Sequence, residues 1–367
     1  MLSLAEILWS DPVSQMRGTT MNTATCSTTT LSPTVRQALR FTEVYRSHRA
    51  SHPATREAAC LRAQFPALLS PIELDDMFAG GHVRERIIYH GSIWFATMPC
   101  KRGKGKQGGY CFDFSAAETF ARSDADREAI AELEAFWSKE CTWSKIEATW
   151  DDQMRSMGRN RAPVVGNGSG FVLAVQIGKL LKLGIPGLAA KIATRTERAR
   201  NEGDTDAVPF LEGLTSAVEL LADVCRHYEQ QARAQLPNAQ SGEDAIRLTR
   251  IADTLAALTQ RPPQTLFEAI QLWWLYSVLT GGLHIEGWRL DVALGDFLAA
   301  DIDSGRLTDE QAVELVSGLW RIYHKHSDHA VSRAIIGGKG RPNEANADRF
   351  CLVAMEVARR LKQVIPQ

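Results

Sequence analysis

The sequence predicts a strongly helix-rich α/β protein, and three observations predict it. Apolar residues recur at helical spacing over most of the chain. Capping boxes at Thr265 and Thr308 mark where two helices begin. A β-branched stretch at 330–338 is followed by glycines and by a helical pattern at about 343–364. That order of strand, turn and helix indicates a βα unit.

The amino-terminal part is expected to contain two helices and then short strands. Residues 32–65 show helical spacing, with Pro33 and Pro53 at positions where helices begin. Segment 80–114 lacks that spacing and is rich in glycine and aromatic residues, which favours short strands. Its basic stretch, 101–106, is expected to form an exposed loop, and solvation is preferred there over phosphate binding.

The middle of the chain is expected to be helical with clear interruptions. A helical pattern covers 123–150 and breaks at 157–171. Gly184 and Pro186 then divide the next pattern into two shorter helices. Residues 208–260 predict a further helical pair.

The domain organisation is expected to be simple. Residues 1–30 are interpreted as a loosely ordered tail, and Met21 is an alternative start. No repeat or low-complexity linker divides 31–367, so these residues are predicted to form one domain.

The stretch 262–291 is the most apolar part of the chain, with two adjacent tryptophans. Thr265 with Glu268 starts a helix there, and Gly281 with Gly282 is expected to end it. A helix of roughly 14 residues spans about 21 Å, against a hydrocarbon core of about 30 Å, which excludes a membrane crossing. Because it is apolar on every face, the helix is predicted to be buried.

Composition limits the partners and the compartment. The 42 basic and 43 acidic residues nearly balance, which excludes nucleic acid or a membrane surface as the main partner. The seven cysteines are scattered, with no C-x-x-C pair, and the amino terminus does not resemble a secretion signal. We therefore expect a cytoplasmic protein, and no cysteine is assigned as a nucleophile.

Two polar clusters invite a functional interpretation. The glycine-rich turn at 337–340 could hold an anion, although a tight turn is preferred because no phosphate-binding motif is completed. His324, His326 and His329 could suggest a metal site, but they do not share one helix face and no carboxylate completes the set. No metal ligand is therefore assigned, and a helical metalloenzyme is the least favoured hypothesis.

A third polar cluster follows the apolar helix. His284 and Glu286 would share one face of an extended segment, with Arg289 and Asp291 shortly after. These side chains could form a salt-bridged turn or line a pocket, and both interpretations stay open.

Five blocks of the sequence, in order, carry a family resemblance: RFTEVYRSHRASHPATREAACLRAQFP with LDDMFAGG, KLLKLGIPGLAAKI, PPQTLFEAIQLWWLY, WRLDVALGDFLAADIDSGRLTDEQAVELVSGLW and AIIGGKGRPNEANADRFCLVAMEVARRLKQVIPQ. They resemble the amino-terminal half of pyruvate formate-lyase-like glycyl radical enzymes, over roughly 31–367. Within that family the likeness is greatest to the formate acetyltransferase branch, on the stretches GGYCFDF, EAFWSKECTWSKIEATW and NEANADRF.

The resemblance implies a fold, a chemistry and a partner. The fold would be part of a ten-stranded α/β barrel enclosed by helices. In the family a glycyl radical, installed by a radical S-adenosylmethionine activating enzyme, oxidises a cysteine, and the resulting thiyl radical takes a hydrogen atom from the substrate. Such chemistry needs a dry interior, which suits the predicted buried helix. The resemblance therefore implies an anaerobic lyase or transferase.

The chain departs from the family in the parts that carry the radical. The family's cysteine and glycyl loops are expected beyond Gln367, so no catalytic residue and no cofactor is assigned to this chain. The residues expected to line a pocket for a small-molecule substrate are Phe171, His284, Glu286, Trp288 and Arg289.

Two hypotheses follow. In the first, the chain is the amino-terminal portion of a glycyl radical lyase or acyltransferase, inactive alone, and is either truncated by a frameshift or gene fragmentation or completed by a second polypeptide. Alternatively, it is a non-catalytic scaffold or subunit that associates with a chain supplying the missing half. A homodimer is left open.

Overall fold

A computed structural model describes residues 31–83, 87, 114–140, 145, 148–159, 177–280, 288–326 and 334–362. The tail 1–30, the basic loop 101–106 and most of the predicted strand region 80–114 lie outside these ranges. The elements are α2 (Pro33–Ser47), α3 (Pro53–Gln64), α4 (Phe114–Phe120), α5 (Asp124–Glu140), α7 (Asp152–Arg159), α8 (Ile177–Glu202), α9 (Ala207–Gln235), the short 3-10 helix η4 (Leu236–Asn238), α10 (Gly242–Leu258), α11 (Leu266–Leu279), β1 (Trp288–Arg289), α12 (Leu290–Asp303), α13 (Asp309–His326), β2 (Ala334–Ile335) and α14 (Glu344–Leu361).

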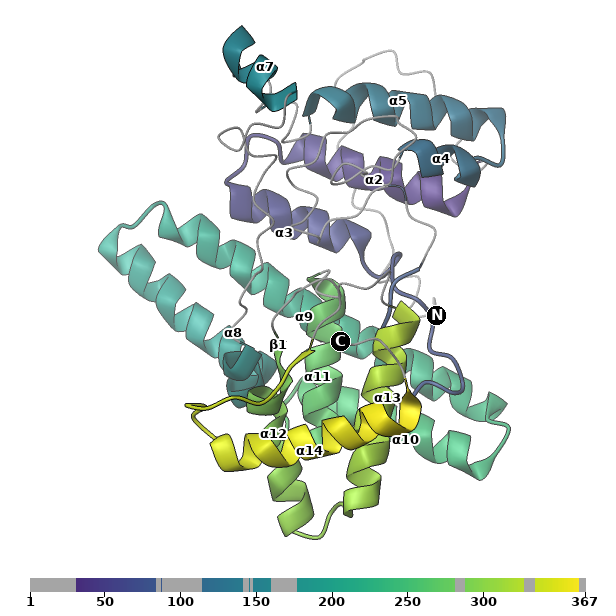
Figure 1. Ribbon diagram of the computed structural model, residues 1–367. Helices are drawn as coiled ribbons and strands as arrows, with labels where there is room; N and C mark the ends of the chain where they lie inside the picture. The colour runs from purple at the N-terminus through teal and green to yellow at the C-terminus, as the bar shows by residue number, and fades with distance from the viewer. Residues whose placement is uncertain are drawn as a thin grey trace, which may run out of the picture.

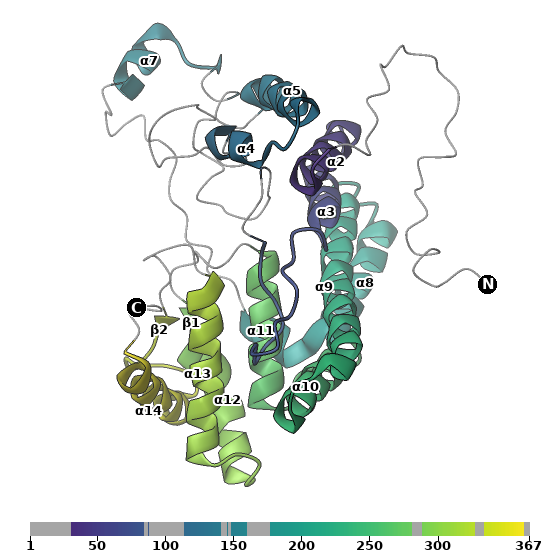
Figure 2. The ribbon, with the colours of Figure 1, turned by 90° about the vertical axis from the view of Figure 1, so that its right-hand side faces the viewer.

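Helix α11 lies in the middle of the molecule. It runs between a layer formed by α8, α9 and α10 and a layer formed by α12, α13 and α14 (Figure 2). All of its residues except Tyr276 are buried, and Trp273 and Trp274 are among the largest fully buried side chains. The prediction of a buried helix of about 14 residues is confirmed. Among the described residues, no helix has the length and apolar character that a membrane crossing requires.

An irregular segment, 79–82, packs on α11 and is hydrogen-bonded to it. The side-chain amide of Gln271 accepts a hydrogen bond from the Ala79 amide (2.9 Å) and donates one to the Ala79 carbonyl (2.8 Å). The indole of Trp274 donates to the Gly80 carbonyl at 3.0 Å. The buried side-chain polar groups of Gln271 and Trp274 are thereby satisfied. Gly80 is required because its φ is +128° and a Cβ would lie 2.9 Å from Leu275.

The helix starts follow local capping chemistry. Thr308 and Gln311 form the predicted reciprocal box, with each backbone amide donating to the other side chain at 2.9 and 3.2 Å. At α11 only half of the predicted box forms. The Thr265 hydroxyl accepts from the Glu268 amide at 3.3 Å, but the Glu268 carboxylate turns to the Gln264 amide and to Arg261 instead.

The other helix predictions can be compared in chain order. Two helices at 32–65 and the pair at 208–260 are confirmed by α2, α3, α9 and α10. The break expected from residue 157 starts later, because α7 continues to Arg159. The Asp151 carboxylate accepts from the Met154 amide at 2.7 Å, which caps α7.

The predicted break at Gly184 is confirmed as a sharp kink inside α8. Gly184 has φ 65° and ψ −178°, outside the helical region, and it lies against Pro262. A Cβ at this position would lie 2.6 Å from the Pro262 Cα. The kink therefore depends both on a left-handed backbone and on a close approach that only glycine permits.

A second, smaller core lies between α2 and α5 at one end of the molecule (Figure 1). Its largest aromatic member, Trp137, donates to the Thr42 hydroxyl at 2.9 Å. Helix α3 joins this layer to α9: Arg62 donates to Ser216 and to Asp223, both at 2.9 Å. Gly213 lets the two helices approach closely, because a Cβ there would lie 2.8 Å from the Ala54 backbone.

Within the described ranges, the strands are β1 and β2, which pair in parallel with Trp288 opposite Ala334 and Arg289 opposite Ile335. Parallel strands joined by intervening helices are an α/β arrangement, as predicted. The complete ten-stranded barrel stays a prediction.

Replacing Gly184 with alanine is expected to destabilise the fold by about 2–4 kcal/mol, from left-handed strain and from overpacking against Pro262. Gly203 is the matched control, since its φ is also positive (+70°) but nothing lies within 4 Å of its Cβ position. There the same change should cost only about 1–2 kcal/mol. Urea unfolding measures both, and equal losses would contradict the packing account of the kink.

Candidate functional site

The candidate site lies at the carboxyl ends of the paired strands β1 and β2. In parallel α/β arrangements, ligands bind at these ends, where the chain leaves the sheet. β1 continues directly into α12, and β2 continues through the glycine turn 337–340 into α14. Residues that follow the two strands therefore lie close together, although they are about fifty residues apart in the sequence.

The carboxylate of Asp291 is the centre of this region and is fully buried. It accepts hydrogen bonds from Arg289 (3.1 and 2.9 Å), from the Val292 and Gly337 amides (both 2.9 Å) and from Arg341 (3.0 Å). The thiol of Cys351 lies 3.7 Å from the same carboxylate. We call Arg289, Asp291, Gly337, Arg341 and Cys351 the Asp291 network.

The network holds Asp291 in its charged form. Burial by itself raises the pKa of this carboxyl, but hydrogen bonds from Arg289, Val292, Gly337 and Arg341 outweigh burial, so the pKa is lowered. Arg341, almost fully buried, also donates to Asp348. Burial and the charge of Asp291 raise the pKa of the Cys351 thiol, which therefore stays protonated and poorly nucleophilic at neutral pH.

The glycine turn adopts the predicted tight geometry. Gly337, Gly338 and Gly340 have φ values of +80°, +88° and +80°. Residues other than glycine rarely adopt such values. The Gly337 amide donates to Asp291, and the Gly340 amide donates to Glu344 at 3.0 Å. Because carboxylates of the chain occupy these two amides, the geometry favours a structural turn over an anion site.

Arg289 is the member of the predicted pocket set that the structure describes with its side chain. Its Nε and Nη2 bind Asp291, and Nη2 also donates to the Gly337 carbonyl at 2.7 Å. The salt-bridged turn considered from the sequence is therefore present. Arg289 is still 38% exposed, and no described residue accepts a hydrogen bond from its Nη1.

The other members of the predicted set stay predictions. Trp288 is placed by its backbone in β1, opposite Ala334. Phe171, His284 and Glu286 lie outside the described residues. Two network members, Arg341 and Cys351, were missed from the sequence. The only sequence signal for Arg341 was its position beside the glycine turn.

The structure describes two of the three clustered histidines. His324 and His326 end α13, and the ring of His326 packs 6.0 Å from that of Trp274. His329 lies outside the described residues. In the described part of the chain, no three histidine, cysteine, aspartate or glutamate side chains are placed to hold a metal ion. The described cysteines outside the network, Cys60 and Cys225, have pKa values raised to about 12 by burial.

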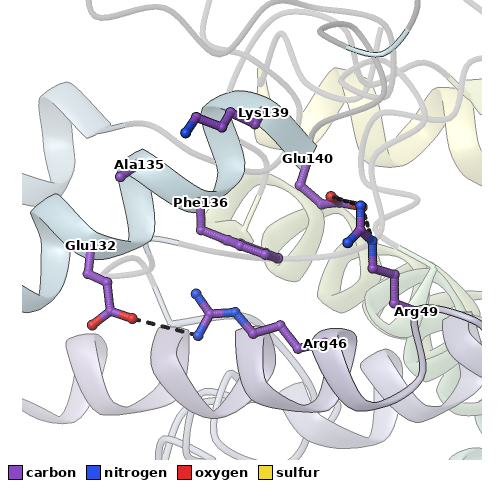
Figure 3. Close-up of a pocket in the computed structure, with 7 residues that line it drawn as sticks. All are labelled: Arg46, Arg49, Glu132, Ala135, Phe136, Lys139 and Glu140. Atoms are coloured by element: carbon purple, nitrogen blue, oxygen red, sulfur yellow. Dashed lines mark hydrogen bonds and ion pairs between the residues drawn. The ribbon is translucent and has the colours of Figure 1, made fainter. Parts of the chain in front are cut away.

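A shallow surface pocket lies elsewhere, between α2 and α5 (Figure 3). Four of its charged residues are paired: Arg46 contacts Glu132 at 3.6 Å and Arg49 contacts Glu140 at 2.9 Å. The Glu140 carboxylate also accepts from Tyr45 at 3.0 Å and binds Lys145. The pocket therefore shows a salt-bridged helix contact and no group poised for chemistry.

Fold and site together define a helix-enclosed α/β protein whose parallel strands are fixed at their carboxyl ends by a buried carboxylate. The family model for pyruvate formate lyase-like proteins matches residues 12–366. The chain belongs to this family, and the resemblance inferred from the sequence is confirmed.

Known proteins of similar sequence and structure are glycyl radical enzymes, lyases and dehydratases. An isethionate sulfite-lyase from Oleidesulfovibrio alaskensis is 22% identical over 237 residues, which is 59% of this chain and 28% of that protein. A B12-independent glycerol dehydratase from Clostridium butyricum has a TM-score of 0.69 at 16% identity over 89% of this chain. A glycyl radical enzyme from Archaeoglobus fulgidus has a TM-score of 0.65 at 17% identity over 90% of this chain.

These structural likenesses show the fold over nearly the whole of this chain. They cover much less of the other proteins, 43% of the glycerol dehydratase chain and 45% of the Archaeoglobus chain. The chain thus spans less than half the length of the relatives that it matches.

Replacing Asp291 with asparagine is expected to lower the free energy of unfolding by about 3 kcal/mol at pH 7, because two guanidinium groups lose a buried charged partner. Since folding lowers the pKa of Asp291, its contribution is present above the unfolded pKa of about 4 and is lost as the pH falls through the lower folded pKa. Urea unfolding between neutral and acid pH should show the difference between the two proteins shrinking.

Asp296→Asn is the matched control for this prediction. Asp296 is an exposed residue of the same helix that accepts from Asn346 at 2.8 Å, so the substitution should change stability by less than about 0.5 kcal/mol. A loss at Asp291 that is equally small, or that does not vary with pH, would contradict the role given to the network.

Proposed function

We propose that this chain forms the amino-terminal part of a glycyl radical lyase or dehydratase that acts on a small hydroxylated substrate. The observation that carries the proposal is a fold shared with glycyl radical enzymes over 89–90% of the chain. The names of two relatives support the substrate class, because isethionate and glycerol are both small and hydroxylated. These two relatives are a lyase and a dehydratase, so we propose elimination rather than the acyl transfer expected of a formate acetyltransferase.

The contribution of this chain would be to enclose and bind the substrate. The Asp291 network fixes β1 and β2, which we propose are two strands of the family's barrel. Residues just before and at the end of β1, namely His284, Glu286, Trp288 and Arg289, would then form one wall of the pocket. The central helix α11 would keep the interior behind this wall free of water, which a radical reaction requires.

The radical itself would come from outside this sequence. The described cysteines are buried, Cys60 and Cys225 in the two hydrophobic cores and Cys351 in the Asp291 network, so none of them is placed to meet a substrate. We propose that a second polypeptide supplies the reactive cysteine and the glycyl radical, and that an activating enzyme installs the radical. Alone, the chain would be inactive.

This proposal is tested by anaerobic reconstitution. The chain, a polypeptide that carries the family's cysteine and glycyl loops, or both together are incubated with the activating enzyme, S-adenosylmethionine and a reductant. Electron paramagnetic resonance detects the glycyl radical, and assays follow loss of isethionate or glycerol. We expect substrate loss only when both polypeptides are present.

Two outcomes would contradict the proposal. Turnover by the second polypeptide alone would show that this chain is not part of the active site. A complex of both that carries the radical but consumes neither substrate would favour the non-catalytic scaffold instead.

Within the reconstituted enzyme, Arg289→Gln is expected to raise KM for an anionic substrate such as isethionate by about 10- to 100-fold, the loss of one charge-assisted contact. KM for neutral glycerol is the internal control, because glycerol has no charge for the Nη1 end of Arg289 to bind. A similar rise for both substrates would show that Arg289 acts only by supporting the Asp291 network.

A further inference from the structure

The pocket between α2 and α5 lies apart from the strand ends that carry the candidate site (Figures 1 and 2). Its volume is about 460 Å³, which is within the range of pockets that hold small molecules. Besides the two ion pairs described above, it is lined by Ala135, Phe136 and Lys139 of α5 (Figure 3). The lining therefore combines an aromatic ring with charged groups that the proposed reaction does not use.

Arg49 offers this pocket an oriented hydrogen-bond donor. Its Nε and Nη2 donate to the carboxylate of Glu140 at 3.1 and 2.9 Å, and that side chain is only 6% exposed. Tyr45 and Lys145 bind the same carboxylate, so Glu140 itself is held in place. Among the described residues, no group accepts a hydrogen bond from Nη1 of Arg49. One edge of a fixed guanidinium is therefore left for a ligand.

Arg46 and Phe136 form a flat surface in the same pocket. The guanidinium carbon of Arg46 lies 4.3 Å from the centre of the Phe136 ring, which is a cation–π contact. Arg46 is 46% exposed, and its ion pair with Glu132 is long and exposed, so this pair contributes little. Because a guanidinium group stacks on aromatic rings through its planar face, the outer face of Arg46 is suited to a second ring supplied by a ligand.

The charge of the pocket favours an anion. Its lining holds three cations and two carboxylates, and Lys145 adds a fourth cation at Glu140. Helices α2 and α5 both end here, and each helix end contributes roughly half a negative charge, so about one positive charge remains. Lys139 is exposed, and no carboxylate of the described residues pairs with it. Its ammonium group is therefore available to a ligand.

We propose that this pocket binds a small aromatic carboxylate. The ring of the ligand stacks on Arg46, and its carboxylate binds Nη1 of Arg49 and the ammonium group of Lys139. Glu132 competes with the ligand for Arg46 and so limits the affinity. This inference does not depend on the reaction proposed above, because the pocket belongs to the smaller core and not to the strand ends.

Saturation-transfer NMR of 2-naphthoate with the full chain tests the proposal. A ligand of this size that binds with ordinary efficiency has a dissociation constant of about 1 mM. Two other probes separate the ring from the charge. 2-Naphthalenemethanol has the ring without the charge, and acetate has the charge without the ring. Each should bind at least about tenfold more weakly than 2-naphthoate, because each loses one of the two contacts.

Two substitutions on α5 should change the affinity for 2-naphthoate in opposite directions. Lys139→Glu should weaken binding about tenfold, because a like charge replaces a contact to the carboxylate. Glu132→Gln should strengthen binding about threefold, because Arg46 loses its competing carboxylate. Lys182→Glu is the matched control: it makes the same charge change at an exposed residue of α8 outside the pocket, and it should leave the affinity unchanged.

The opposite directions separate a changed site from a misfolded chain, because misfolding does not strengthen binding. Three results would each overturn the proposal. In the first, 2-naphthoate does not bind. In the second, 2-naphthalenemethanol binds as tightly as 2-naphthoate. In the third, the Lys139→Glu and Glu132→Gln variants have the same affinity for 2-naphthoate.

Discussion

The complete burial of α11 is the constraint on which the rest of the structure depends. A helix with no polar face must be covered on every side, and two helical layers cover most of it. Segment 79–82 also covers part of it, and the backbone of this segment exchanges two hydrogen bonds with Gln271 and receives one from Trp274. Without these bonds, buried polar atoms would each cost about 1–3 kcal/mol. The path of an irregular segment is therefore set by the side chains of the helix beneath it.

The Asp291 network solves a related problem at the strand ends. A buried carboxylate is tolerated only with enough donors, and here they come from β1, from the start of α12, from the glycine turn and from Arg341. One charged group thereby ties together two strands and two helices that are distant in sequence. The carboxyl end of β1, where the pocket wall is proposed, is thereby held in a fixed position.

Local features of the fold could be predicted from the sequence, and distant partners could not. The starts at Thr265 and Thr308 and the kink at Gly184 follow from chemistry within a few residues, and the structure contains all three. Glu268 shows the limit, because Arg261 and the Gln264 amide compete for its carboxylate. Arg341 lies fifty residues from Asp291, and no pattern of spacing indicates that they meet. In the candidate site, the pairing of Arg289 with Asp291 could be predicted because the two residues are neighbours.

The attachment of α2, α4 and α5 also bears on how the molecule opens. These helices form a core of their own, which α3 connects to α9. The charged part of that connection, Arg62 with Glu219 and Asp223, is largely exposed to water and so contributes little, about 0–1 kcal/mol per pair. The layer can then separate and unfold as a cooperative unit while α11 keeps its cover. Hydrogen exchange of the backbone amides in α2 and in α11 would then report two different opening reactions. A single free energy of unfolding would not describe the whole chain.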